Sequence, residues 1–244
     1  MIDQVLSNAI SARGAKNGLH ITSGHIEYVV DELFYPVGNR GAVLYVGIGH
    51  GQDAIMALMN ANVRTITGID PYKTNVHEYV DLLSLIKKYE LEGFFNLHKT
   101  SLEEYLSNLT PKTKFDSIVC CDVLHHIFAT GTLVLRDSLV YIRALETFKK
   151  LRSVGNNLIV SDVQRHGLRP FLAKYGILKT GVNYQKKQDW QEWNHVITEA
   201  GWKLKEKKTY VPFALRNYKS MLNNELAQHT ICDRYFLYYE SGNY

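Results

Sequence analysis

The segment Val43–Gly51 reads VLYVGIGHG, and the rest of the chain is organised around it. It begins as a short run of apolar, β-branched residues, which is typical of a buried strand. Glycines follow at positions 47, 49 and 51, where a missing side chain permits positive φ and lets the backbone approach a ligand closely. Residues 52–60 then place apolar side chains on one helical face. A strand, a glycine turn and a helix N-terminus are typical of a nucleotide site, although the same layout also serves ordinary strand-to-helix connections.

The spacing of these glycines separates two classes of nucleotide site. A dinucleotide fingerprint requires glycine at positions 47, 49 and 52, but position 52 is Gln52 and the third glycine is Gly51. The resulting G-x-G-x-G pattern after a strand resembles motif I of the class I S-adenosylmethionine (SAM)-dependent methyltransferases. The chain departs from that motif at Tyr45, where the family commonly has an acidic residue.

A carboxylate follows the second predicted strand, Thr65–Ile69. Asp70 lies 19 residues beyond Gly51, and a carboxylate about 20 residues on is the group that accepts both hydroxyls of a ribose in such sites. Pro71 and the tyrosine after it offer apolar surface for an adenine face. The alternative is that Asp-Pro only begins a turn.

The second informative stretch is Phe115–Ile127, which reads FDSIVCCDVLHHI. Its apolar part predicts a buried strand, and Asp122, His125 and His126 follow at the carboxyl end, where ligands bind in open α/β sheets. A VLHH-type sequence after a strand opened by Phe-Asp is very similar to the fourth-strand motif of the same family. The resemblance covers residues 40–165 and, more weakly, residues 189–240.

The resemblance implies an α/β fold and a cofactor. The fold is a Rossmann-like, doubly wound, seven-stranded and mostly parallel sheet, with the last strand, near residues 234–240, inserted antiparallel between strands five and six. The cofactor is S-adenosyl-L-methionine, which leaves as S-adenosyl-L-homocysteine. The cofactor-binding positions that it implies are Tyr45, Gly47, Ile48, Gly49, Gly51, Asp70, Pro71, Ser101, Leu102, Asp122 and Leu124.

Three segments lie outside this framework of one domain, residues 1–244. Residues 1–40 predict an N-terminal helical cap. Residues 163–188 and 212–233 fall where loops overhang the strand ends, so we expect both inserts to lie over the acceptor site. Their basic side chains favour an anionic acceptor, such as a carboxylate, a phosphate or a sugar acid; the alternative is that these are solvated surface helices. After the fourth strand, a long helix is predicted, and its apolar stripe is expected to bury Leu135, Leu139, Ile142, Leu145 and Phe148.

Methyl transfer to a hydroxyl or an amine requires removal of a proton, and histidine has a suitable pKa for that. His125 and His126 are candidate bases because they follow the fourth strand, and His166 is a third because it follows the fifth. The alternative for each is a structural role. Asp122 and Asp162 resemble part of the magnesium site of catechol-type O-methyltransferases, but Val163 stands where those enzymes have a further acid or amide. We therefore expect no metal.

Composition limits the remaining possibilities. The chain has 244 residues and a net charge of +4, and it lacks an apolar run of membrane-spanning length and a basic signal-peptide start. Its three cysteines lack disulfide or metal spacing, so we expect a cytoplasmic protein. Without a base-methylating motif or a dense basic stripe, a small-molecule acceptor is favoured and no nucleic acid or membrane partner is expected. The alternatives are a methyltransferase acting on RNA or protein, an NAD-dependent oxidoreductase and a non-catalytic binding module.

Overall fold

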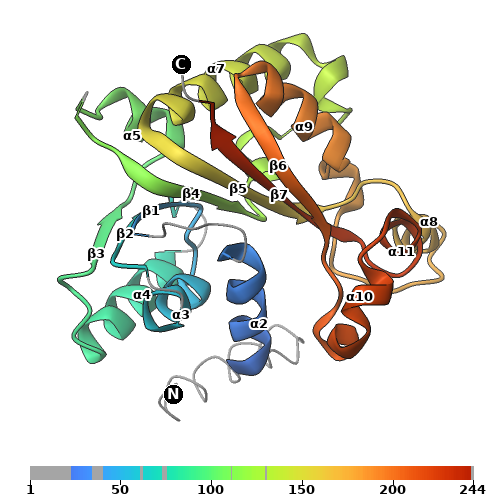
Figure 1. The fold of residues 1–244 in the computed structure, drawn as a ribbon, viewed down its shortest axis with the longest axis horizontal. Coiled ribbons are helices and arrows are strands. Elements are labelled where there is room, and N and C mark those ends of the chain that lie inside the picture. Colours follow the sequence, from blue (N-terminus) through green and yellow to red (C-terminus); the bar gives the residue numbers. More distant parts are fainter. Residues whose placement is uncertain are drawn as a thin grey trace.

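One seven-stranded sheet forms the centre of the computed structural model, which describes residues 23–34, 41–60, 63–72, 76–110, 112–129 and 131–242. The strand order is β3-β2-β1-β4-β5-β7-β6. Strands β1 to β5 pair in parallel, whereas β7 pairs antiparallel with both β5 and β6 (Figure 1). The strands are β1 (Ala42–Val46), β2 (Thr65–Ile69), β3 (Phe95–His98), β4 (Phe115–Cys121), β5 (Gly155–Val163), β6 (Trp202–Thr209) and β7 (Arg234–Ser241). The predicted fold class, including the antiparallel last strand, is confirmed.

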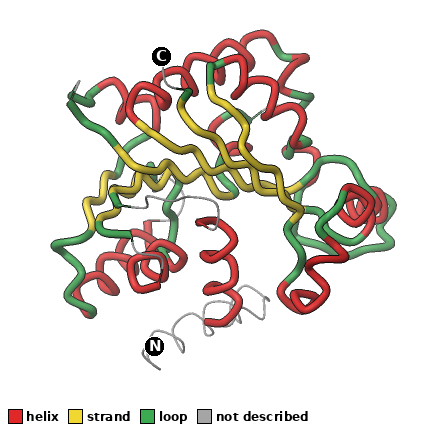
Figure 2. The backbone as a smooth tube through the Cα atoms, viewed as in Figure 1, coloured by secondary structure: helices red, strands yellow, loops and turns green. Residues whose placement is uncertain are grey.

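Helices cover both faces of the sheet (Figure 2). On one face lie α2 (Ser23–Phe34), α3 (Gln52–Asn60) and α4 (Val76–Lys88), and on the other lie α5 (Leu102–Ser107), α7 (Ser138–Val154) and α9 (Trp190–Glu199). The short elements α6 (Leu124–Ile127) and η1 (Val134–Arg136) join β4 to α7. Alternate strand residues feed the two cores, as the pleat requires: Val43 and Tyr45 pack with α2 and α3, whereas Leu44 and Val46 pack on the face of α7 and α9.

The buried face of α7 differs from the prediction. Leu139 and Ile142 are 80% and 56% exposed, and the helix instead buries Ala144, Phe148 and Leu151. The buried side of the helix is rotated from the predicted one, because Val140 and Tyr141 of its N-terminal half pack against the same core as Ala144 and Leu151. Phe148 is the one residue of the predicted stripe that is fully buried.

The two inserts contain short helices and pack against each other. The first holds α8 (Leu168–Lys174) and η2 (Tyr184–Lys186), and the second holds η3 (Phe213–Tyr218), α10 (Lys219–Leu222) and α11 (Glu225–Thr230). Figure 1 shows α8 beside α11 at one end of the molecule, where a Cβ on Gly167 would lie 3.1 Å from the carbonyl oxygen of His229.

Helix α2 of the predicted N-terminal cap is bound to the second insert. The Tyr28 hydroxyl donates to the carbonyl oxygen of Val211, at 3.0 Å, and Lys219 forms an ion pair with Glu32. The remainder of the predicted cap, residues 1–22 and 35–40, lies outside the described residues. Within the part of the chain that the structure describes, no helix has the length and apolar character needed to cross a membrane.

Candidate active site

The glycine turn after β1 has a backbone that other residues rarely adopt. Gly47, Gly49 and Gly51 all have positive φ, at 69°, 49° and 65°. The amide of Gly47 donates to the carbonyl oxygen of Ile69 at 2.8 Å, which ties the turn to the end of β2. A Cβ on Gly47 would lie 2.3 Å from Cγ2 of Val123, so the turn also lies directly against the segment after β4.

Asp70 binds this turn directly. Its carboxylate accepts hydrogen bonds from the amide of Gly49, at 3.3 Å, and from the amide of Tyr72, at 2.8 Å. The Tyr72 hydroxyl donates to the carbonyl oxygen of Gly49, at 2.8 Å, and closes the ring of contacts. The glycine turn and the carboxylate, 19 residues apart in sequence, therefore form one rigid unit at the ends of β1 and β2.

A cavity of about 580 Å³ opens beside this unit, within the usual range for a small-molecule site. We call it the strand-end cavity, because the last residues of β1, β2 and β4 form its floor. Its walls are formed by Val46, Gly47, Ile69, Asp70, Pro71, Tyr72, Glu78, Thr100, Ser101, Leu102, Glu103, Cys121, Asp122, Val123, His126, Ile127 and Arg143.

Six of the predicted cofactor-binding positions lie on this wall. They come from four separate parts of the chain and are Gly47, Asp70, Pro71, Ser101, Leu102 and Asp122. Ser101 also accepts a hydrogen bond from the amide of Glu104, at 3.2 Å, and so caps the N-terminus of α5.

The other five predicted positions do not line the cavity. Ile48, Gly51 and Leu124 are buried, and Gly49 contributes through its contacts with Asp70. Tyr45 is buried in the core, where its hydroxyl donates to Asp53 of α3. Burial, with the nearby Asp53 charge, raises the pKa of Tyr45 well above its usual value. The Tyr45 hydroxyl and the Asp53 carboxylate are thus hydrogen-bonded to each other beneath the glycine turn.

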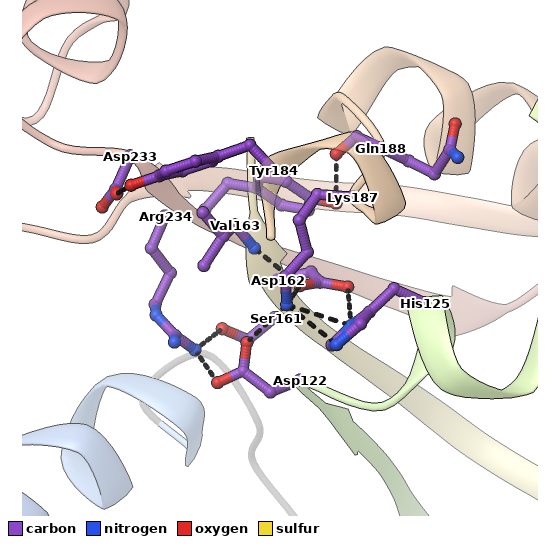
Figure 3. Close-up of polar contacts among 11 residues, drawn as sticks. Asp122, His125, Ser161, Asp162, Val163, Tyr184, Lys187, Gln188, Asp233 and Arg234 are labelled. Carbon is purple, nitrogen blue, oxygen red and sulfur yellow. Dashed lines mark hydrogen bonds and ion pairs between the residues drawn. The ribbon is translucent and has the colours of Figure 1, made fainter. Parts of the chain in front are cut away.

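Beside the strand-end cavity lies a group of five charged or titratable side chains, which we call the ionic cluster: Asp122, His125, Asp162, Lys187 and Arg234 (Figure 3). The Lys187 ammonium lies 2.9 Å from Asp162 and 3.9 Å from Asp122, whose other oxygen is 2.5 Å from Arg234. Asp162 is fully buried. Burial alone would raise its pKa, but the hydrogen bond from His125 and the Lys187 charge outweigh this and lower it.

His125 has no nitrogen available to an acceptor. Its Nδ1 lies 3.1 Å from Asp162, and the Lys187 ammonium lies 3.1 Å from Nδ1 and 3.0 Å from Nε2. The carboxylate and the ammonium together contact both ring nitrogens. His125 is also only 8% exposed. The structure therefore places this predicted base in a structural position.

His126 is the histidine that faces the strand-end cavity. Its ring lies over that of His125, with centroids 4.1 Å apart. Burial, together with the charges of His125 and Lys187, lowers the pKa of His126. A lowered pKa keeps the imidazole neutral near pH 7, which is the form that accepts a proton.

His166, the third predicted base, lies elsewhere. It is exposed in the first insert, and its ring and backbone amide both bind Asp189 at the start of α9. It lines a separate hollow within that insert rather than the strand-end cavity.

The two aspartates of the magnesium alternative already have cationic partners. Lys187 and Arg234 neutralise Asp162 and Asp122, and a divalent ion between them would have to displace the Lys187 ammonium. Among the described residues, no group of three or more His, Cys, Asp or Glu side chains has the arrangement of a metal site.

Sequence reasoning missed Lys187 and Arg234 as members of the site. Lys187 appeared only as one of many basic residues of an insert, and Arg234 only as the first residue of a strand. They lie 65 and 112 positions beyond Asp122, and no local pattern relates them to it.

The fold is that of the class I SAM-dependent methyltransferases. An S-adenosylmethionine-dependent methyltransferase from Clostridium acetobutylicum ATCC 824 superimposes with a TM-score of 0.63 over 97% of this chain and 99% of its own, at 11% identity. One from Aquifex aeolicus gives 0.57 over 99% and 100%, at 13% identity. Both names give S-adenosylmethionine as the cofactor of the neighbour itself. No family profile and no curated protein sequence matches the chain.

Other neighbours with the same fold differ in what they do. The small RNA methyltransferase HEN1 has a TM-score of 0.61 and 12% identity, and the match covers 92% of this chain but 26% of HEN1. The [4+2]-cyclase SpnF has a TM-score of 0.57 and 12% identity over 88% of this chain and 80% of its own. At these identities the likeness establishes the fold, and the reaction has to be argued from the site.

Proposed function

We propose that this protein binds S-adenosyl-L-methionine in the strand-end cavity and transfers its methyl group to an oxygen of a small-molecule acceptor. The observation that carries the proposal is the contact between Gly49 and Asp70. It holds bare backbone and a carboxylate together at the wall of one cavity.

The residues present fit this cofactor. Asp70 uses two of about four acceptor positions on its carboxylate for backbone amides, which leaves capacity for the two ribose hydroxyls. Gly47 lines the cavity with bare backbone, in a position where a Cβ would overlap Val123. Pro71, Ser101 and Leu102 would border the adenine. The buried Oδ1 of Asp122 has no hydrogen-bond partner among the described residues, and it would accept one from the amino group of the methionine part.

Bound SAM would supply a methyl group that its sulfonium charge already activates for displacement. The protein then has to align the acceptor, which is worth about 7–11 kcal/mol in well-oriented reactions, and to remove its proton. His126 is our candidate for the proton acceptor, because it lines the cavity and its pKa is lowered. Asp162 and Lys187 hold the neighbouring His125 ring in place.

Calorimetry tests the binding step. The wild-type protein should bind SAM and S-adenosyl-L-homocysteine with dissociation constants in the micromolar range, and NAD should show no comparable affinity. Asp70→Ala should weaken SAM binding by about tenfold, as expected for the loss of hydrogen bonds to a charged group. Glu92→Ala, which removes an exposed carboxylate in a turn before β3, is the matched control and should leave the affinity unchanged.

The results separate the alternatives. Unchanged affinity in Asp70→Ala would remove the ribose assignment, and NAD binding without SAM binding would favour an oxidoreductase. SAM binding without transfer to any hydroxyl compound would favour a binding module or, as for the neighbour named a cyclase, a different reaction on the same fold.

A further inference from the structure

The first insert carries basic side chains without any acidic ones. Residues 163–188 contain six Lys and Arg side chains and no Asp or Glu. The chain as a whole has 28 basic and 24 acidic side chains, so outside this insert the acids outnumber the bases by two. The positive charge of the protein is therefore concentrated in one segment.

This segment folds around a second hollow, of about 1150 Å³, which we call the insert hollow. Three of the six cations, Arg165, Lys174 and Lys179, lie on its wall, and no Asp or Glu of the described residues does. None of the three forms an ion pair with a described residue. By contrast, Lys187 belongs to the ionic cluster, and Arg169 lies 3.5 Å from Asp233. The three cations of the hollow thus lack an acidic partner among the described residues, as does the exposed Lys186, which lies outside the hollow.

The wall of the insert hollow includes a hydrogen-bonded arginine and two aromatic side chains. The Arg165 guanidinium donates to the carbonyl oxygens of Gly131 and Thr132, at 2.9 and 3.0 Å, which holds the loop after α6 against the insert. Phe171 and Tyr184 contribute aromatic surface. The Tyr184 hydroxyl is held by Asp233 at 2.7 Å.

The two hollows are close to each other along the chain. Ile127 lines the strand-end cavity and Gly131 lines the insert hollow. Four residue steps span at most about 14 Å even when fully extended, so the two walls lie within about that distance of each other at these residues.

We propose that the insert hollow binds the charged end of the methyl acceptor, and that the acceptor is an organic anion, a phosphate or a carboxylate, with an apolar body. The role as an acceptor subsite rests on the proposed methyl transfer, whereas anion binding itself does not. Arg165, Lys174 and Lys179 bind the anion, and Phe171 packs against the apolar body.

The test is direct binding without SAM, measured by calorimetry at low salt. The probes are phenyl phosphate and phenylacetate, with inorganic phosphate and phenol as partial ligands. Phenyl phosphate or phenylacetate should bind more tightly than either partial ligand, and the tighter of the two identifies the anion. Binding should weaken as salt is added, because these cations are exposed to solvent.

Two variants locate the site. Lys174→Gln/Lys179→Gln should weaken binding of the better probe by about tenfold, within the range for two exposed charges. Lys87→Gln/Lys88→Gln makes the same change of charge on exposed residues of α4 and should have no effect. Phe171→Ala should weaken binding of phenyl phosphate but not of inorganic phosphate.

Three results would overturn the proposal: phenol binding as tightly as the anions, equal losses in the two lysine pairs, or unchanged affinity in Lys174→Gln/Lys179→Gln. SAM affinity, measured in the same variants, should not change. Failure of SAM binding would refute the proposed function and the acceptor role that rests on it but not anion binding, whereas failure of probe binding would refute the insert site and leave the proposed function standing.

Discussion

The strand-end cavity and the insert hollow are built by different means. The first lies at the ends of three strands, beside a turn held by three left-handed glycines and by Asp70. The second lies among short elements of an insert and carries three Lys and Arg side chains and no acid on its described wall. A cavity at strand ends is fixed by the fold and suits an invariant ligand, whereas one built on an insert can change its specificity without changing the fold.

His126→Ala tests whether methyl transfer takes place in the strand-end cavity. Turnover should fall by about 10²–10⁴-fold, the usual contribution of a general base, while SAM affinity stays within about twofold. The control is His195→Ala on α9, an exposed histidine that lines neither hollow. Unchanged turnover in His126→Ala would mean that the base lies elsewhere or that none is needed.

The pH profile adds an independent measurement. Burial and neighbouring positive charge lower the pKa of His126 from its usual value near 6.5. The neutral form is the active one, so kcat/KM should be flat above about pH 6.5 and should fall only as the pH drops through the lower pKa. An acid limb that begins above pH 7 would contradict this assignment.

Lys187→Met tests the junction between the two regions. Lys187 belongs to the first insert by sequence, but its ammonium binds Asp162 and His125 beside the strand-end cavity. Its loss leaves a fully buried carboxylate without its cation, which typically costs about 3–5 kcal/mol in the free energy of unfolding. Urea denaturation measures this. The control is Lys186→Met, at the exposed neighbouring residue, which should change the free energy of unfolding little.

The double variant Asp162→Asn/Lys187→Met should be more stable than Lys187→Met, because no buried charge is left. The pKa of Asp162 is lowered in the fold, so its contribution to stability is complete above the unfolded value of about 3.9 and disappears as the pH falls through the lower folded value. If Lys187→Met were as stable as the wild type, the ionic cluster would not hold the insert in place.

The contrast between the regions also explains what the sequence could predict. The turn at residues 47–51, Asp70 and the end of β4 were found because their chemistry lies in short patterns at fixed spacing. The antiparallel last strand between strands five and six followed through the family resemblance.

What was missed depends on contacts between distant segments. Whether His125 or His126 faces the cavity depends on which of them Asp162 and Lys187 hold, and no local pattern encodes that. Arg234 joins Asp122 only because β7 is antiparallel and starts at the edge where β4 ends. Tyr45, at the position of a family acid, turned out to donate to Asp53 on the next helix.

Gly47→Val tests whether bare backbone forms the strand-end cavity. The new Cβ would lie 2.3 Å from Val123, which also lines the cavity, so SAM affinity should fall by about 100-fold or more. Gly176→Val is the matched control, because Gly176 has a similar φ of 72° and no atom within 4 Å of its Cβ position. The control has the same backbone strain and should keep its SAM affinity. Equal losses in both variants would indicate general destabilisation instead.

Tyr45→Phe should have the smallest effect on the cofactor. It removes the hydroxyl that donates to Asp53 and leaves that buried carboxylate without its partner, so stability should fall by about 1–3 kcal/mol. SAM affinity should change by less than about twofold, since Tyr45 does not line the cavity. Tyr238→Phe, which removes a buried hydroxyl that donates to the Glu32 carbonyl oxygen on the same face of the sheet, is the comparison for stability. A fall in SAM affinity of about fivefold or more in Tyr45→Phe alone would contradict this and would show that the Tyr45–Asp53 pair supports the cofactor through the glycine turn.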